Sequence, residues 1–138
     1  MREYKFRGKR IDNGEWVHGF LVTSVNDRTY IIVYATEDAV NTGNKIDFIY
    51  VEVIPETVGQ YTGLNDKNGK EIYEGDVHEY DGMRFDVRFG FFFDEEFQEE
   101  SYGWYMYNKK YPDVGGRLDK ASDTYVEVIG NIHEEVTE

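Results

Sequence analysis

Apolar and polar residues alternate along much of this chain, and the alternation is clearest between residues 83 and 93. There, Phe or Val occupies every second position from Phe85 to Phe93, while charged residues such as Arg84 and Asp86 stand between them. Successive side chains of a β-strand point to opposite faces of its sheet. The segment is therefore predicted to be a strand with one aromatic, apolar face.

Strands are also predicted along the rest of the chain, over residues 16–24, 30–35, 48–54, 102–107 and 124–131. The Asn-Gly pair at 13–14 and the Asp-Gly pair at 81–82 are typical of tight hairpin turns. Residues 94–100 are compatible with a short helical turn or a loop, and a single helical turn is compatible with residues 117–122. A total of about seven or eight short strands favours a mainly β fold, with antiparallel strands forming a small barrel-like or packed-sheet core and little helix.

The chain has 138 residues, of which 40% are hydrophobic. This is enough to bury one core, so we expect a single domain over 1–138. A division into an N-terminal β part, 1–58, and a small C-terminal barrel, 59–133, is compatible with the pattern.

The most distinctive segment, "QYTGLNDKNGKEIYEGDVHEY", covers residues 60–80. Asn and Asp side chains bond nearby backbone amides and Gly adopts left-handed conformations, so the segment is predicted to reverse the chain twice. A calcium loop is disfavoured because Lys70 stands at a ligand position and Val77 where a bidentate acid belongs. A phosphate-binding motif is absent, whereas a protein contact through an exposed loop remains an alternative. The residues assigned to this structural motif are Gln60, Thr62, Gly63, Asp66, Asn68, Gly69, Glu74, Gly75 and Asp76.

The formal net charge is −13, which repels nucleic acid at long range. Charge is also uneven along the chain, because residues 1–10 form a basic run and residues 94–100 form an acidic run. Solvated surface is the simplest reading of both charged runs; the alternative is contact between the basic end of one subunit and the acidic run of another. The candidate contact residues are Arg2, Lys5, Arg7, Lys9 and Arg10 at the basic end, and Asp94, Glu95, Glu96, Glu99 and Glu100 in the acidic run.

The sequence contains few residues or motifs that are typical of catalysis or metal binding. Cysteine is absent, so disulfides, thiol catalysis and Cys-ligated zinc are excluded. The three histidines, His18, His78 and His133, have no helical metal-pair spacing. No hydrolase, zincin or dinucleotide motif occurs. We therefore expect no enzyme activity, no metal and no cofactor. The basic N-terminus lacks an apolar core behind it, and no apolar run is long enough for a membrane span, so a soluble intracellular protein is expected.

The aromatic face of residues 85–93, with the aromatic residues of 102–107, has two interpretations. Exposed aromatics can stack nucleic-acid bases, but such platforms usually lie in basic grooves and this neighbourhood is acidic. Packing in the core is the favoured interpretation. Any apolar surface left over would point to self-association.

Three stretches resemble the YopX family, small proteins of bacteriophages and prophages: "MREYKFRGKRIDNGEWVHGF", "VIPETVGQYTGLNDKNGKEIYEGDV" and "VEVIGNIHE". The resemblance departs at the terminal "EEVTE", where the family often ends in an Asn-Pro-Glu-Leu-like sequence. It implies a largely β fold with a small barrel-like part after the central motif, and no activity or catalytic residue. We expect a location in the cytoplasm of the bacterial host.

The leading hypothesis is accordingly a phage- or prophage-encoded accessory protein that acts without catalysis, as a homo-oligomer or by contact with a host or phage protein. The alternative is a nucleic-acid-related role. It would be either a small barrel that binds single strands or an acidic DNA mimic that occupies a host protein.

Overall fold

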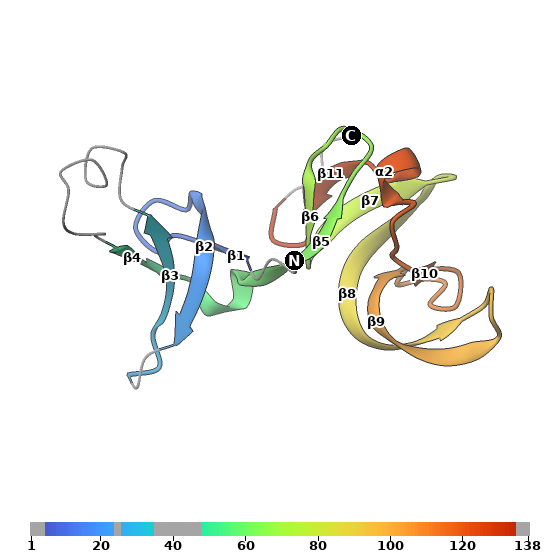
Figure 1. Cartoon of the computed structure of the whole chain (residues 1–138), viewed down its shortest axis with the longest axis horizontal. Coiled ribbons are helices and arrows are strands. Elements are labelled where there is room, and N and C mark those ends of the chain that lie inside the picture. The colour runs from blue at the N-terminus through green and yellow to red at the C-terminus, as the bar shows by residue number, and fades with distance from the viewer. Residues whose placement is uncertain (1–4, 24–25, 35–47, 135–138) are drawn as a thin grey trace. The chain divides into compact units, whose positions relative to one another are not determined.

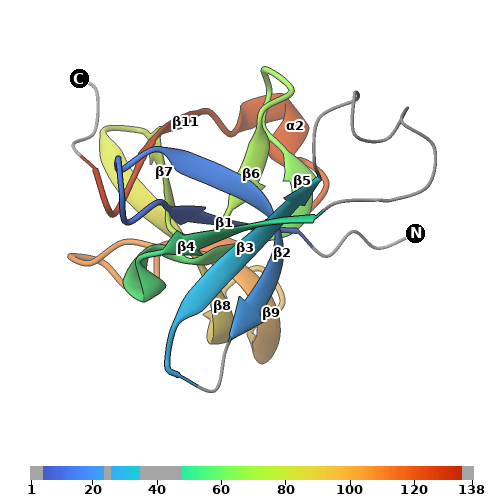
Figure 2. The same cartoon turned by 90° about the vertical axis from the view of Figure 1, so that its left-hand side faces the viewer.

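The computed structural model describes residues 5–23, 26–34 and 48–134 (Figures 1 and 2). Its contacts divide the chain into two compact units, Met1–Gln60 and Tyr61–Glu138. The prediction of a mainly β, antiparallel fold is confirmed. The described strands form a six-stranded and a five-stranded sheet, accompanied by one short α-helix and a 3₁₀ turn. In the described part of the chain neither sheet closes into a barrel.

The first unit is an antiparallel meander in the order β4-β3-β2-β1-β5. Its elements are β1 Phe6–Lys9, β2 Trp16–Thr23, β3 Thr29–Tyr34, β4 Phe48–Val53, the 3₁₀ turn η1 Pro55–Thr57, and the start of β5 Gly59–Asn65. The predicted turn at residues 13–14 lies in the β1–β2 connection. Ile31 and Val53 are fully buried in this unit. The basic N-terminal stretch is therefore an inner strand, because β1 pairs with β2 on one side and with β5 on the other.

The second unit contains the other elements. They are β6 Glu71–Tyr73, β7 Asp76–Tyr80, β8 Met83–Asp94, β9 Glu99–Tyr107, β10 Gly116–Arg117, α2 Ser122–Tyr125 and β11 Val128–Asn131. β6 pairs with the second half of β5, and the remaining strands form the sheet β10-β9-β8-β7-β11. A cluster of apolar side chains from three strands and two loops fills the core. Its buried members are Ile72, Phe85, Val87, Met106, Leu118 and Val126.

The hairpin of β8 and β9 is the longest element pair, and it curls strongly along its length (Figure 1). Gly90 and Gly103 stand opposite each other at its middle, with φ of 150° and 153°. Backbone of this kind favours glycine, and glycine in a strand often marks a bend. The outer end of the hairpin consequently leaves the core. Asp94 at the end of β8 pairs with Arg117 of β10, with 3.1 Å between Oδ2 and Nε.

Of the two alternatives for residues 94–100, the structure forms the loop, because residues 95–98 make the turn between β8 and β9. The helical turn considered within 117–122 was misplaced and lies at α2, where the Ser122 hydroxyl donates a 2.9 Å hydrogen bond to the Asn65 carbonyl oxygen. This contact with the end of β5 positions the turn. The strand expected over 124–131 therefore begins only at Val128.

Candidate functional site

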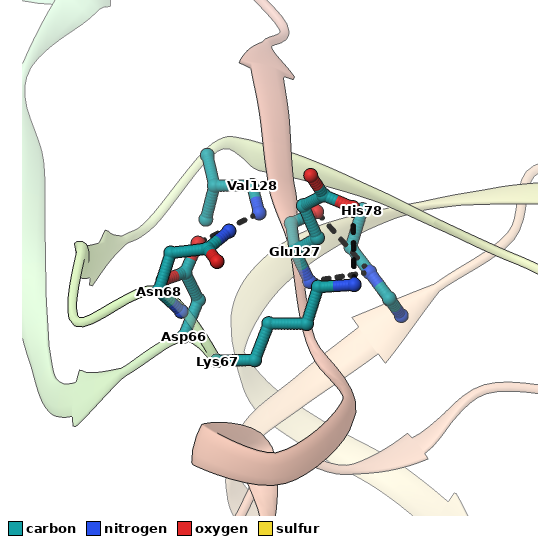
Figure 3. A network of polar contacts seen from close by, with 6 residues as sticks. All are labelled: Asp66, Lys67, Asn68, His78, Glu127 and Val128. Atoms are coloured by element: carbon teal, nitrogen blue, oxygen red, sulfur yellow. Dashed lines mark hydrogen bonds and ion pairs between the residues drawn. The ribbon is translucent and has the colours of Figure 1, made fainter.

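Residues 66–70 of the distinctive central segment form the β5–β6 loop, and the buried carboxylate of Asp66 organises it (Figure 3). Asp66 Oδ1 accepts hydrogen bonds from the backbone N–H groups of Asn68 and Lys70, both at 2.9 Å. Oδ2 accepts a third, at 3.0 Å, from the N–H of Val128 in β11. Gly69 completes the turn with a φ of 80°. One side chain therefore shapes its own loop and holds the last strand of the sheet.

Residues 126–128 are held by further contacts from the same loop and from β7 (Figure 3). The Lys67 N–H donates to the Val126 carbonyl oxygen at 2.8 Å, and Lys67 Nζ lies 3.3 Å from Glu127 Oε2. The Glu127 N–H donates to Nδ1 of His78 at 3.1 Å. The ion pair between Lys67 and Glu127 is exposed and contributes little to stability. The backbone contacts therefore attach β11 to the loop.

The remaining motif residues form β5 and the β6–β7 turn. Thr62 Oγ1 donates to the Ile72 carbonyl oxygen at 2.8 Å across the β5–β6 pair. Asp76 is buried, and its Oδ2 accepts the Tyr73 N–H at 2.8 Å. Gln60 pairs with Phe6 in the first unit. Gly63 lies within β5, and Glu74 and Gly75 form the turn itself.

Acid should weaken the Asp66 contacts. Burial raises the pKa of this carboxyl, but the N–H donors of Val128, Lys70 and Asn68 outweigh it and leave the pKa below its ordinary value of 3.8. A lowered pKa in the folded state means that the stabilisation is complete above the unfolded value and is lost as the pH falls through the folded one. We expect the melting temperature of the wild type to fall more steeply below pH 4 than that of Asp66→Asn. Thermal melts of both proteins between pH 7 and pH 2 test this, and parallel curves would contradict it.

A cleft of about 240 Å³ lies in the second unit, beside His78. It was not predicted, because its lining comes from β7, the β8–β9 hairpin with its turn, residues 114–117 and the segment around α2, which are far apart in the sequence. Its polar and aromatic lining residues include His78, Tyr80, Asp94, Glu95, Glu96, Arg117, Asp119 and Tyr125.

His78 is a buried, neutral histidine. Only 2% of its surface is exposed, and burial lowers its pKa, although contact with the Glu127 backbone opposes this. Nδ1 lies 3.1 Å from the Glu127 nitrogen and 3.3 Å from the Glu127 carbonyl oxygen, so it accepts from the N–H in one tautomer and donates to the oxygen in the other. Nε2 is buried and has no hydrogen-bond partner among the described residues.

Two tyrosines stand beside this ring. The ring centroids of Tyr80 and Tyr125 lie 6.4 and 6.0 Å from that of His78. Burial raises the pKa of Tyr125, and the nearby Asp119 raises it further, so this hydroxyl stays protonated at neutral pH. The cleft therefore combines neutral donors with carboxylate acceptors and aromatic walls.

The aromatic face of β8 is divided between core and surface, so the prediction that it packs in the core is wrong for its outer half. Phe85 is 5% exposed, whereas Phe91 is 79% exposed and Tyr102 of β9 is 60% exposed. Phe89 and Phe93 are also exposed. The rings contact one another, with centroid distances of 5.1 Å for Phe89–Tyr102 and 4.7 Å for Phe91–Tyr102. We call the residues Phe89, Phe91, Phe93 and Tyr102 the outer aromatic face.

The residues of the basic and acidic runs differ in how far they are exposed and in how they are paired. Arg7 is buried with its guanidinium 4.8 Å from the ring centroid of Trp16, and Arg10 pairs with Asp12 at 2.7 Å. Arg2 lies outside the described residues, and Lys5 and Lys9 are partly buried. Asp94 is buried against Arg117. Arg7 and Asp94 therefore do not belong to an exposed contact surface, but the four glutamates Glu95, Glu96, Glu99 and Glu100 are exposed.

The other histidines do not converge with His78. His18 belongs to β2 in the first unit, and His133 follows β11 in the second. Within residues 5–23, 26–34 and 48–134, no group of three acidic or histidine side chains is placed to hold a metal ion. In the same residues no helix has the length and apolar character needed to cross a membrane.

The family model described as YopX protein matches residues 5–137, nearly the whole chain. No curated protein matches the sequence.

Proposed function

The chain belongs to the YopX family, and we propose that it is a phage- or prophage-encoded accessory protein that acts by contact with another protein and not by catalysis. The observation that supports this function is the outer aromatic face of the β8–β9 hairpin. Side chains of this size are usually buried. A contiguous group of them on the surface is typical of an interaction site.

The geometry of the outer aromatic face suits a protein contact. The ring of Phe89 meets Tyr102 and Trp104 edge-on, at centroid distances of 5.1 and 4.9 Å. Mutual packing restricts these rings before a partner binds, which lowers the entropic cost of association. Aromatic residues of this kind dominate the binding energy of many interfaces.

Charge favours a partner different from this chain. Glu99 and Glu100 lie at the start of β9, and Glu95 and Glu96 lie in the turn before it, close to the aromatic rings in the hairpin. Two copies meeting at this face would bring two acidic runs together, at a net charge of −13 each. We therefore assign the face to a protein that presents apolar groups surrounded by lysine and arginine.

The test is a pull-down from host cells, followed by direct titration of the identified partner in purified form. The variant Phe91→Ala/Tyr102→Ala should bind the partner at least about tenfold more weakly, since two central aromatics are removed. Tyr50→Ala is the matched control, because this tyrosine is 61% exposed but lies in the first unit. It should bind like the wild type, and moderate salt should weaken binding of both.

Other outcomes would overturn this assignment. A homo-oligomer in light scattering that Phe91→Ala/Tyr102→Ala dissolves would give the outer aromatic face to a second copy. A gel shift with single-stranded DNA at low salt would favour base stacking on the same rings. Competition with DNA for a host protein, without a shift, would indicate a DNA mimic.

A further inference from the structure

We propose that the outer aromatic face recognises an arginine side chain of its protein partner. The guanidinium stacks on an exposed ring, and the Glu100 carboxylate accepts its N–H groups. This inference rests on the proposed function, because it names the chemical group that the partner presents to the same face.

The strand register places one carboxylate among the exposed rings. Phe93 stands directly opposite Glu100, and Phe91 stands directly opposite Tyr102. Directly opposite residues of an antiparallel pair share a face, with Cβ atoms about 4.5–5.5 Å apart. Glu100 is exposed. Its neighbour Glu99 belongs to the other face of the hairpin, because successive side chains of a strand alternate. A guanidinium stacked on the outer aromatic face is therefore within reach of the Glu100 carboxylate.

The opposite face of the same hairpin holds one of the protein's own arginines in this way. The Arg88 guanidinium lies 3.8 Å from the ring centroid of Tyr107, and its Nε lies 2.7 Å from Oδ2 of Asp86. Arg88 is positioned by these two groups although 47% of its side chain is exposed. A ring beside a carboxylate therefore suffices to position a guanidinium at the surface of this protein.

Arg117 of β10 repeats the arrangement with Phe92 and Asp94. Its guanidinium lies 5.8 Å from the Phe92 ring centroid, and its Nε lies 3.1 Å from Oδ2 of Asp94. The outer aromatic face has the rings and the carboxylate without the arginine. In the part of the chain that the structure describes, no cation lies over these rings. In the same part, Glu100 forms no ion pair. A partner's arginine would complete on this face the arrangement that the opposite face already has.

Arginine fits this face better than lysine or a purely apolar group. Its planar guanidinium can stack on a ring and present N–H groups to a carboxylate at the same time. The lysine ammonium is a compact point charge that is more strongly hydrated. An apolar side chain would cover the rings but remove Glu100 from water without giving it a partner, which costs free energy.

The experiment is an NMR titration of the full ¹⁵N-labelled chain with three acetylated and amidated pentapeptides: Gly-Arg-Gly-Arg-Gly and its lysine and citrulline counterparts. The arginine peptide should shift the backbone amides of Phe91, Phe93 and Tyr102. The lysine peptide carries the same charge and should bind at least about threefold more weakly. The citrulline peptide has nearly the same shape without the charge and should produce no shift at the same concentration.

Three variants locate the contact. Glu100→Gln removes the carboxylate and should weaken binding of the arginine peptide at least about threefold. The matched control Glu99→Gln makes the same charge change on the opposite face, so the affinity should stay within about 1.5-fold. Phe91→Leu keeps an apolar side chain but removes the aromatic ring, and it should weaken binding about threefold.

The arginine assignment is overturned if the arginine and lysine peptides bind equally, if the arginine peptide shifts only amides outside the hairpin, or if Glu99→Gln and Glu100→Gln lose affinity equally. The proposed protein contact would survive these results, provided that Phe91→Ala/Tyr102→Ala still weakens binding of the partner. Specific binding of the arginine peptide, together with a partner that the double variant binds like the wild type, would instead remove the protein contact and keep the guanidinium site.

Discussion

Replacing Asp66 by alanine should lower the free energy of unfolding of the second unit by about 3 kcal/mol or more, because three backbone N–H groups lose a charged acceptor. One of these donors, Val128, belongs to β11 and lies 62 positions further along the chain. The loss should therefore reach beyond the loop. Urea denaturation followed by circular dichroism measures the stability, and hydrogen exchange at the Val128 amide reports the local effect.

Asp113→Ala serves as the control for Asp66→Ala. Asp113 is an exposed aspartate in the same unit, so its removal should change stability by no more than about 0.5 kcal/mol. If Asp66→Ala also costs less than about 1 kcal/mol, or if Val128 keeps its exchange protection, the carboxylate does not hold β11.

Phe85→Ala and Phe91→Ala should differ strongly in stability, although both residues belong to the alternating phenylalanine pattern of β8. Phe85 is 5% exposed within the core cluster, and its truncation should cost about 3–5 kcal/mol through lost burial and a residual cavity. Phe91 is 79% exposed, and its truncation should stay within about 0.5 kcal/mol. Denaturant titration of the two variants under the same conditions measures the contrast.

The contrast between the two phenylalanines also tests the proposed contact surface. If Phe91→Ala proves as costly as Phe85→Ala, the outer aromatic face is part of the core, and the support for a protein contact disappears. If both variants behave as expected, Phe91 can be changed in binding experiments without unfolding the protein.

The structure gives the central segment a definite mechanical role. Asp66 closes its own turn and receives β11, while His78 receives the neighbouring Glu127 N–H. Asp66 thereby helps to determine where β11 lies.

Much of the local structure followed from the sequence. Alternation of apolar and charged residues predicted the strand at 83–93, because the pleat sends successive side chains to opposite faces. The Asn, Asp and Gly residues of 66–75 predicted chain reversals, which the structure forms at 67–68 and at 74–75. These properties depend on neighbours within a few positions, so a single chain reveals them.

The tertiary structure alone decided which residues meet. Phe85 and Phe91 are equivalent in the alternating pattern, but the hairpin bends at Gly90 and Gly103 and only its inner half reaches the core. In the sequence Asp66 resembles an ordinary turn residue, and only the structure shows that its Oδ2 accepts a hydrogen bond from the Val128 N–H. The cleft joins four separate segments, and the basic strand β1 is partly buried because strands pair on both of its sides. Periodicity describes which way a side chain points, whereas burial and pairing depend on what the rest of the chain places in front of it.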